Sequence, residues 1–151
     1  MRKMEQIRDF FKAKDKFARH CGIDLVDVAP GQAKTSMKIE SHHLNGAGTV
    51  HGGAIFTLAD FAFAVASNSH GSLSMGINAS VSFVKAVSEG SLHAEATEQS
   101  LNHKLASYLV RITDDAGEMV AIFQGMVYRK KQPIISNFIP SQVVPNTQKK
   151  Q

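Results

Sequence analysis

The chain has 151 residues, 43% hydrophobic and 20% charged, with a net charge of +4 that is too mild and too dispersed to indicate nucleic-acid binding. A single cysteine, Cys21, excludes an internal disulfide framework and is typical of a reducing compartment, so we expect a cytoplasmic protein. No apolar run reaches the roughly 18 residues that a membrane span requires, and residues 1–16 are too charged for a secretory signal.

The first 21 residues have the pattern of one amphipathic helix. Apolar residues, among them Ile7, Phe10 and Phe11, recur at three- and four-residue steps, and charged residues occupy the other faces. Gly22 follows in the position of a helix cap. We expect a helix over residues 1–21 packed on the outside of a sheet, with a membrane-surface or partner-binding helix as the alternative.

Alternating apolar and polar residues predict strands in the rest of the chain. Residues 23–29 and 32–40 are separated by the turn signal Pro30-Gly31 and predict a hairpin. Further strands are expected over residues 77–83, 92–98, 105–113 and 119–129. The polar, proline-punctuated segment 132–151 is expected to be a C-terminal tail, either partly loose or docked through Ile134, Ile135, Phe138 and Ile139. The interpretation is a single domain over residues 1–131.

A glycine-spaced loop followed by a very apolar helix occupies the centre of the chain. Between Gly53 and Ala66 only Thr57 and Asp60 are polar, so we expect a helix over residues 53–67 that is buried on all sides. About six antiparallel strands curled around this helix would give an α+β domain. Asp60 would then be a buried lone carboxylate, which is costly unless it is paired. We interpret Asp60 as catalytic, and a structural carboxylate bound to nearby backbone is the alternative.

The start of this helix predicts an oxyanion site. A helix N-terminus carries unpaired N–H groups and a partial positive charge, and Gly52-Gly53 lets a ligand approach them closely. Asp60 would serve as nucleophile or general base. Gly52 and Asp60 are separated by about 12 Å along one helix, so a single thioester cannot touch both. Two antiparallel copies of the helix bring the two groups together, which predicts a homodimer with two shared sites.

Other common sites are excluded by spacing. GAGTVHG has His51 where a dinucleotide fingerprint has its third glycine, and GSLSMG lacks the serine and glycine spacing of a nucleophile elbow. The cluster of His42, His43 and His51 has no HExxH pattern or cysteine pair, and Cys21 has no evident partner. We expect no metal and no cofactor.

The segment HLNGAGTVHGGAIFTLADFAFAVASNSHG resembles the active-site segment of the PaaI-like acyl-CoA thioesterases of the hotdog-fold superfamily. The hallmark is Asn, then HGG, then a helix reading F-x-L-A-D-x-A, and the resemblance covers roughly residues 20–130. It implies a sheet wrapped around this helix, a dimer that usually pairs into a dimer of dimers, and hydrolysis of acyl- or aryl-acetyl-CoA without a metal. By position, Asp60 would be the catalytic carboxylate, Gly52 the oxyanion donor, and Asn45 the residue that helps place the carbonyl or the water.

Several other residues are candidates for substrate binding, each with a structural alternative. In the structural alternatives, Asn45 only starts the loop turn, which asparagine favours, and Gly52 is only a helix-entry glycine. The lysines are then only solvated surface residues. Many relatives have a basic residue followed by proline where this chain has Lys85-Ala86, which leaves the end of that strand in doubt. The candidates around the pocket are His51, Gly53, Thr57, Asn68, Ser69 and Lys85. Lys104, Arg129 and Lys130 are, with Lys85, candidates for contacts to the CoA phosphates.

Two other functions remain open on the sequence. One is a non-catalytic acyl-CoA-binding sensor on the same scaffold, although the N-terminal 21 residues are too short for a separate output module. The other is a hotdog enoyl-thioester hydratase or dehydratase, for which His51 is the only nearby histidine that could assist the acid.

Overall fold

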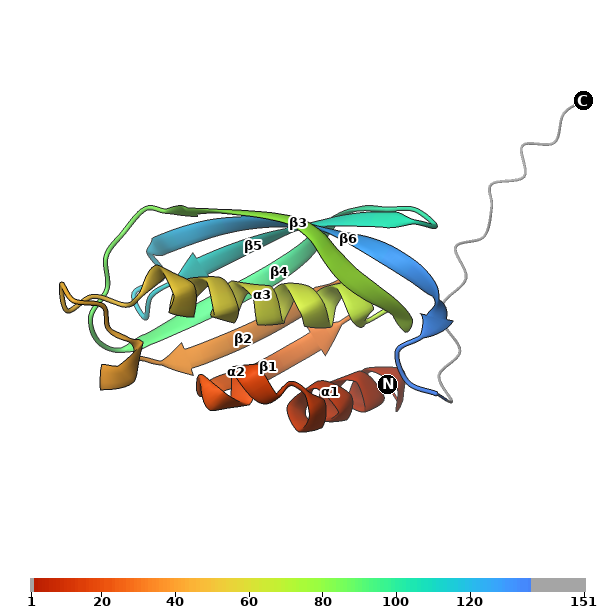
Figure 1. Cartoon of the computed structure of the whole chain (residues 1–151), viewed down its shortest axis with the longest axis horizontal. Helices are drawn as coiled ribbons and strands as arrows, with labels where there is room; N and C mark the ends of the chain where they lie inside the picture. The colour runs from red at the N-terminus through yellow and green to blue at the C-terminus, as the bar shows by residue number, and fades with distance from the viewer. Residues whose placement is uncertain (1, 137–151) are drawn as a thin grey trace, which may run out of the picture.

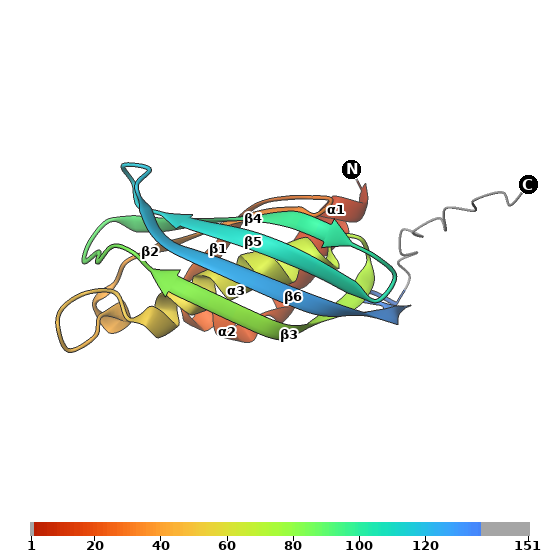
Figure 2. The ribbon, with the colours of Figure 1, turned by 90° about the horizontal axis from the view of Figure 1, so that it is seen from above.

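The computed structural model describes residues 2–136 as a six-stranded antiparallel sheet wrapped around one long helix (Figures 1 and 2). The elements in chain order are α1 (Arg2–Lys14), α2 (Lys16–His20), β1 (Ile23–Ala29), β2 (Gln32–Lys38), the 3-10 helix η1 (Ser41–His43), α3 (Gly52–Asn68), β3 (Ser72–Phe83), β4 (Ser91–Leu101), β5 (Leu105–Thr113) and β6 (Met119–Pro133). The strand order β1-β2-β4-β5-β6-β3 places β1 and β3 at the two edges. The predicted α+β architecture is therefore confirmed.

The apolar residues of the predicted alternating pattern face the central helix. In β2, Ala33, Thr35 and Met37 are buried while the residues between them are half-buried or exposed. The Thr35 hydroxyl donates a 3.1 Å hydrogen bond to the carbonyl of Leu58 on α3. The predicted β1–β2 hairpin is also present, paired from Ile23 with Met37 to Ala29 with Gln32. The concave face of the sheet thus supplies most of the core.

Helix α3 is not buried on all sides, so that prediction is wrong. Its buried residues are Ile55, Leu58, Ala59, Phe61, Ala62, Phe63, Val65, Ala66, Ser67 and Asn68. The remaining side forms what we call the uncovered stripe of α3, made of Gly53, Phe56, Thr57, Asp60 and Ala64, which are exposed or half-buried. Helix positions three and four apart share a face, and the sheet of one chain leaves this face open.

The N-terminal segment is two helices and not one, which corrects the prediction of a single helix over residues 1–21. Asp15 interrupts the helix with backbone angles φ −81° and ψ 88°, and its side chain accepts a 3.1 Å hydrogen bond from the N–H of Ala18. Aspartate bonds readily to nearby backbone N–H groups and therefore favours helix starts over helix interiors. Both helices lie beside β1, and both also contact α3 (Figure 1).

Strand β3 is an unusual edge strand. It pairs with β6 and has no strand on its other side in the part of the chain that the structure describes. Its apolar residues Met75, Ile77 and Phe83 are 49%, 57% and 53% exposed. The strand contains no proline and no charged residue, which are the usual protection of a free edge. An edge of this composition is suited to pairing with another strand.

The C-terminal strand runs further than its predicted end at Arg129. β6 continues to Pro133, and the N–H of Ile134 donates a 2.9 Å hydrogen bond to the carbonyl of Gly71. Ile134 and Ile135 pack against the core, as expected, whereas Phe138 and Ile139 lie outside the described residues. Within residues 2–136, no helix is both long enough and apolar enough to cross a membrane.

Candidate active site

An open cavity of about 590 Å³ lies between α1, α2, α3 and the first half of β3. Its volume is that of an ordinary small-ligand site. The charged lining residues are Lys14, Asp15, Lys16 and Asp60, and much of the apolar lining is Phe10, Phe11, Phe17, Phe63, Leu73 and Met75. Such a cavity can hold an apolar or aromatic acyl group with a carboxylate at its side.

Asp60 is a carboxylate that no neighbour neutralises. Its outer part is open to solvent in the single chain, and no hydrogen bond or ion pair joins it to any residue in the range 2–136. The protein atoms on its other sides desolvate it, and this burial, followed by the negative charge of Asp15, raises its pKa above the usual aspartate value. A carboxylate with a raised pKa and a free lone pair is suited to accept a proton or to attack a carbonyl.

The N-terminus of α3 presents one free amide. His51 is the N-cap residue, and its Nδ1 accepts a 2.8 Å hydrogen bond from the N–H of Gly53. The carbonyl of His51 accepts from Ala54 and Ile55. The N–H of Gly52 has no acceptor among the described residues. Among the first amides of the helix, the Gly52 N–H is therefore available to a ligand. The partial positive charge of the helix N-terminus strengthens its attraction for a negatively charged oxygen.

Phe83 belongs to this end of the helix, although the sequence identified it only as a strand residue. A Cβ at position 52 would lie 3.0 Å from Cζ of Phe83, so the half-exposed ring covers Gly52 closely. The close approach explains why glycine is suited to this position. The contact depends on the end of β3 lying against the start of α3. No local sequence pattern could have predicted it.

Asn45 organises the loop before α3. Its Oδ1 accepts hydrogen bonds from the N–H groups of Ala47 and Thr49 at 3.0 and 3.2 Å, and its Nδ2 donates to the Thr49 hydroxyl at 3.0 Å. The side chain thus forms a local turn and does not line the cavity beside Asp60. Within one chain, the structure does not bring Asn45 and Asp60 together.

Thr57, Asn68 and Ser69 each have a partner within the fold. The Thr57 hydroxyl donates a 2.8 Å hydrogen bond to the carbonyl of Gly53, one turn earlier on the uncovered stripe. Asn68 lines the cavity, but its Nδ2 donates to the carbonyls of Ala64 and Ser74 and its Oδ1 accepts from the N–H of Ser74 at 2.9 Å. The buried Ser69 hydroxyl donates to the carbonyl of Ala66 at 2.6 Å.

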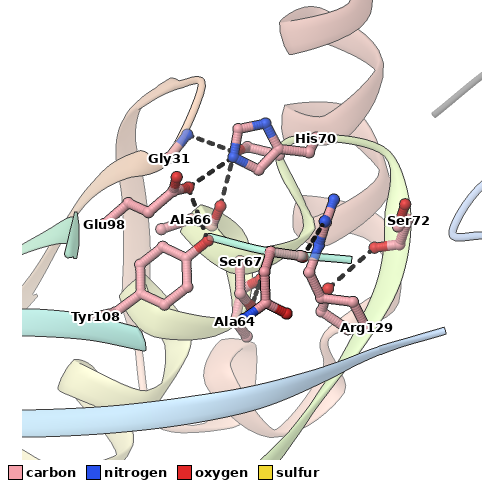
Figure 3. A network of polar contacts seen from close by, with 12 residues as sticks. Gly31, Ala64, Ala66, Ser67, His70, Ser72, Glu98, Tyr108 and Arg129 are labelled. Carbon is pink, nitrogen blue, oxygen red and sulfur yellow. Dashed lines mark hydrogen bonds and ion pairs between the residues drawn. The ribbon is translucent and has the colours of Figure 1, made fainter. Parts of the chain in front are cut away.

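A polar network fastens the C-terminal end of α3 to the sheet (Figure 3). The N–H of Gly31, in the β1–β2 turn, donates to the Ser69 hydroxyl at 2.8 Å. Glu98 on β4 contacts Nε2 of His70 at 2.6 Å and accepts a 3.0 Å hydrogen bond from the Tyr108 hydroxyl. Burial, and then the Glu98 carboxylate, raise the pKa of Tyr108, so its hydroxyl stays a donor. The His51 cap holds the N-terminal end of α3, and this network holds the C-terminal end. Asp60 therefore lies on a helix that is fixed at both ends.

Two of the basic candidates for phosphate binding have their charges occupied or buried. Lys85 pairs with Asp114 at 2.6 Å and with Glu118, and these hydrogen bonds, that to Asp114 first, raise its pKa. Arg129 is 5% exposed and donates a 2.7 Å hydrogen bond to the carbonyl of Asn102, so it is not a surface contact. Lys104 and Lys130 are exposed.

The structure gives no metal-ligand cluster in the part of the chain it describes. Within residues 2–136, no three side chains of histidine, cysteine, aspartate or glutamate converge. His43, one of the clustered histidines, is buried, accepts from the N–H of Glu40 at 2.9 Å through Nδ1, and contacts the carbonyl of Cys21 at 2.7 Å through Nε2. Its ring is therefore a structural link between the loop and the end of α2.

The comparison with known proteins points to one family. Residues 47–121 match the Thioesterase superfamily. A protein of Archaeoglobus fulgidus, named only provisionally as an esterase, is 41% identical over 83% of this chain and 82% of its own length. The acyl-coenzyme A thioesterase PaaI of Escherichia coli is 32% identical over 76% of this chain and 83% of its own length.

Solved structures agree with the sequence relatives. The structure of the E. coli PaaI protein from the phenylacetic acid degradation operon superimposes with a TM-score of 0.84 at 28% identity, covering 87% of this chain and 96% of that one. The TT0310 protein of Thermus thermophilus has a TM-score of 0.74 at 33% identity, with 78% and 99% covered. The family resemblance seen in the sequence is confirmed, and the chain belongs to the PaaI-like thioesterases of the hotdog-fold superfamily.

Proposed function

We propose that the protein hydrolyses acyl-CoA thioesters to free acid and CoA, with Asp60 of one subunit and the Gly52 amide of another acting on the same carbonyl. The observation that carries this proposal is that, within residues 2–136, neither the Asp60 carboxylate nor the Gly52 N–H has a hydrogen-bond partner. Asp60 attacks the thioester carbon or takes a proton from the attacking water. The Gly52 amide donates to the oxygen as it becomes negative.

The packing of β3 on α3 supports a shared site. The Phe83 end of β3 lies at Gly52, and Gly76, nearer its start, lies against Phe63, the residue three positions after Asp60. An antiparallel pairing of two β3 edges centred between Ala79 and Ser80 would place Phe83 of one copy opposite Gly76 of the other. The Gly52 amide of one copy would then face Asp60 of the other, and the exposed Met75 and Ile77 would be covered.

The substrate class follows from the cavity and from the relatives. The cavity beside Asp60 is lined mostly by aromatic and aliphatic side chains, which suits an aryl-acetyl or medium-length acyl group. The 32% identical E. coli relative is named an acyl-coenzyme A thioesterase. Because Nδ1 of His51 is engaged by the Gly53 amide, hydrolysis is better supported than a hydratase reaction that uses His51 as a base.

The test compares four variants in a thioester hydrolysis assay. Asp60→Asn and Asp60→Ala should reduce kcat by several orders of magnitude. Gly52→Pro removes the N–H at the first helical position, where proline is tolerated, and the preceding His51 already has proline-compatible angles of φ −59° and ψ 135°. Gly52→Ala is its matched control, because it adds a similar Cβ beside Phe83 but keeps the amide.

Loss of one oxyanion donor should cost about 3 to 4 kcal/mol of transition-state stabilisation, or roughly 10²- to 10³-fold in kcat. Gly52→Pro should therefore fall far below Gly52→Ala. Equal activity of the two, or undiminished turnover by Asp60→Ala, contradicts the mechanism. Tight binding of CoA esters by the wild-type protein without any hydrolysis would favour the sensor.

A further inference from the structure

Phe63 closes the inner wall of the acyl cavity. It lies one turn after Asp60 on α3 and lines the same cavity, although only 3% of its surface is exposed. Its ring packs edge-on against Tyr108 and tilted against Phe123, with ring centroids 5.7 and 5.5 Å apart. These two buried rings occupy the space behind Phe63, so the cavity is the side toward which its ring can move.

Glycines on two neighbouring strands let Phe63 lie this deep. A Cβ at Gly125 on β6 would be 2.6 Å from Cζ and 2.7 Å from Cε2 of Phe63, which is closer than a real contact. A Cβ at Gly76 on β3 would be 3.3 Å from Cε1. Neither glycine has a positive φ, so the reason for glycine at these positions is this close approach and not backbone conformation.

We propose that Gly125 sets the depth of the acyl pocket by seating the Phe63 ring against the sheet, so that the site accepts an aryl-acetyl or medium-length acyl group. This inference rests on the proposed thioesterase function and names the residues that select its substrate. A side chain at position 125 displaces the ring into the cavity, because the interior around Tyr108 and Phe123 is already filled. A shallower pocket then excludes large acyl groups while still admitting small ones.

The experiment measures kcat/KM for acetyl-CoA, hexanoyl-CoA and phenylacetyl-CoA. Gly125→Ala should lower kcat/KM for the two larger esters by about tenfold or more relative to acetyl-CoA, in line with the discrimination that one or two methylenes provide in an apolar pocket. Adding Phe63→Leu to Gly125→Ala removes the displaced ring and should restore much of the activity on the larger esters. Phe63→Leu alone should favour esters bulkier than those preferred by the wild type.

Phe61→Leu is the matched control. It makes the same phenylalanine-to-leucine change at a buried position of α3, but Phe61 contacts Phe11 and is absent from the lining of the acyl cavity. It should change all three kcat/KM values by a similar factor. If Gly125→Ala is too unstable to assay, Gly76→Ala, with its milder 3.3 Å contact, should show a smaller shift in the same direction.

The results separate the failure of this inference from that of the proposed function. An unchanged ratio of large to small esters in Gly125→Ala overturns the inference, and so does a uniform loss that Phe63→Leu does not repair. If the wild type hydrolyses none of the esters, the proposed function fails on its own. Titration calorimetry with phenylacetyl-CoA and acetyl-CoA then tests whether Gly125→Ala selectively weakens binding of the larger ester.

Discussion

Nδ1 of His51 accepts a 2.8 Å hydrogen bond from the N–H of Gly53, so the histidine caps α3 one residue beyond the amide that stays free. His51→Ala should lower the free energy of unfolding by about 1 kcal/mol through loss of the cap. His51→Asn should restore stability, since asparagine is a strong N-cap residue. Chemical denaturation and kcat/KM are measured on both. An Asn variant that regains stability but stays as inactive as the Ala variant would show that the imidazole has a chemical role.

Local sequence located most of the elements and the glycine-rich start of α3. Alternation, weak over residues 23–29 and clean over residues 32–40, and the turn residues between them predicted the β1–β2 hairpin. The glycine-to-helix transition predicted accessible amides at Gly52-Gly53, and the family resemblance assigned the donor role to Gly52. The break at Asp15 was missed because apolar spacing on both sides of it is continuous. The alternation over residues 77–83 located β3 but not its start at Ser72.

The surroundings of three candidate site residues depend on contacts between distant parts of the chain, which the sequence does not show. Lys85, just after β3, is paired with Asp114 and Glu118 of the β5–β6 turn, and Arg129 is buried with its guanidinium bonded to the carbonyl of Asn102. Neither position looks different from a solvated surface cation in sequence. The exposure of Asp60 was also unpredictable from its helix, because an all-apolar pattern does not show which face is covered by the same chain and which awaits a second one.

The raised pKa of Asp60 should appear in both activity and stability. As a nucleophile or base Asp60 must be ionised, so kcat should fall as the pH drops through a pKa above the ordinary aspartate value of about 3.9. Asp15→Asn keeps a capping side chain for α2 but removes the neighbouring negative charge. It should therefore move the acid limb of the pH–rate profile to lower pH. An acid limb that stays in place would show that Asp15 does not affect the titration.

The same shift has a defined sign for stability. A folded-state pKa above the unfolded value means that the folded protein binds the proton more tightly, so ionised Asp60 destabilises the fold. Asp60→Asn should raise the melting temperature at neutral pH, and the gain should shrink as the pH falls through the raised pKa and vanish below the ordinary aspartate pKa of the unfolded chain. Melting curves across this range for both proteins test the sign. A variant less stable than the wild type at neutral pH would indicate that Asp60 has a stabilising partner in the assembled protein.

Asn68 should prove structural even though it lines the cavity. Asn68→Ala leaves the buried N–H of Ser74 without its acceptor and removes one donor from each of the carbonyls of Ala64 and Ser74, which should cost about 2 to 3 kcal/mol in the free energy of unfolding. Asn68→Asp should be worse, because a carboxylate oxygen would face the carbonyls of Ala64 and Ser74. Ser67→Ala, which removes one hydrogen bond from the same cavity wall, should cost less than about 1 kcal/mol. Asn68 variants with full stability and a raised KM would instead assign it to substrate binding.

The ion pairs of Lys85 argue against its predicted role in binding the CoA phosphates. Lys85→Gln should change KM for an acyl-CoA less than about twofold, because Asp114 and Glu118 already hold the ammonium group and exposed pairs contribute little. Lys104→Gln and Lys130→Gln make the same change at exposed lysines. Comparing acyl-CoA with the corresponding acyl-pantetheine, which lacks the nucleotide phosphates, isolates the phosphate contact. A KM increase for Lys85→Gln confined to the CoA ester would show that the lysine leaves its partners to bind CoA.

Mixed assemblies test directly whether the site is shared. Asp60→Ala and Gly52→Pro subunits should each form inactive homodimers, but a mixed dimer would pair the intact Asp60 of one subunit with the intact Gly52 amide of the other. After unfolding and refolding an equal mixture, about half of the dimers should be mixed and each should hold one competent site of two, giving about a quarter of the wild-type activity. A mixture of the two variants that is never unfolded controls for contaminating activity. Asp60→Ala protein unfolded and refolded alone controls for any activity that refolding produces. Activity that stays at the level of the separate variants would contradict a site shared between subunits, because a mixed dimer would then contain no site with both an intact Asp60 and an intact Gly52 amide.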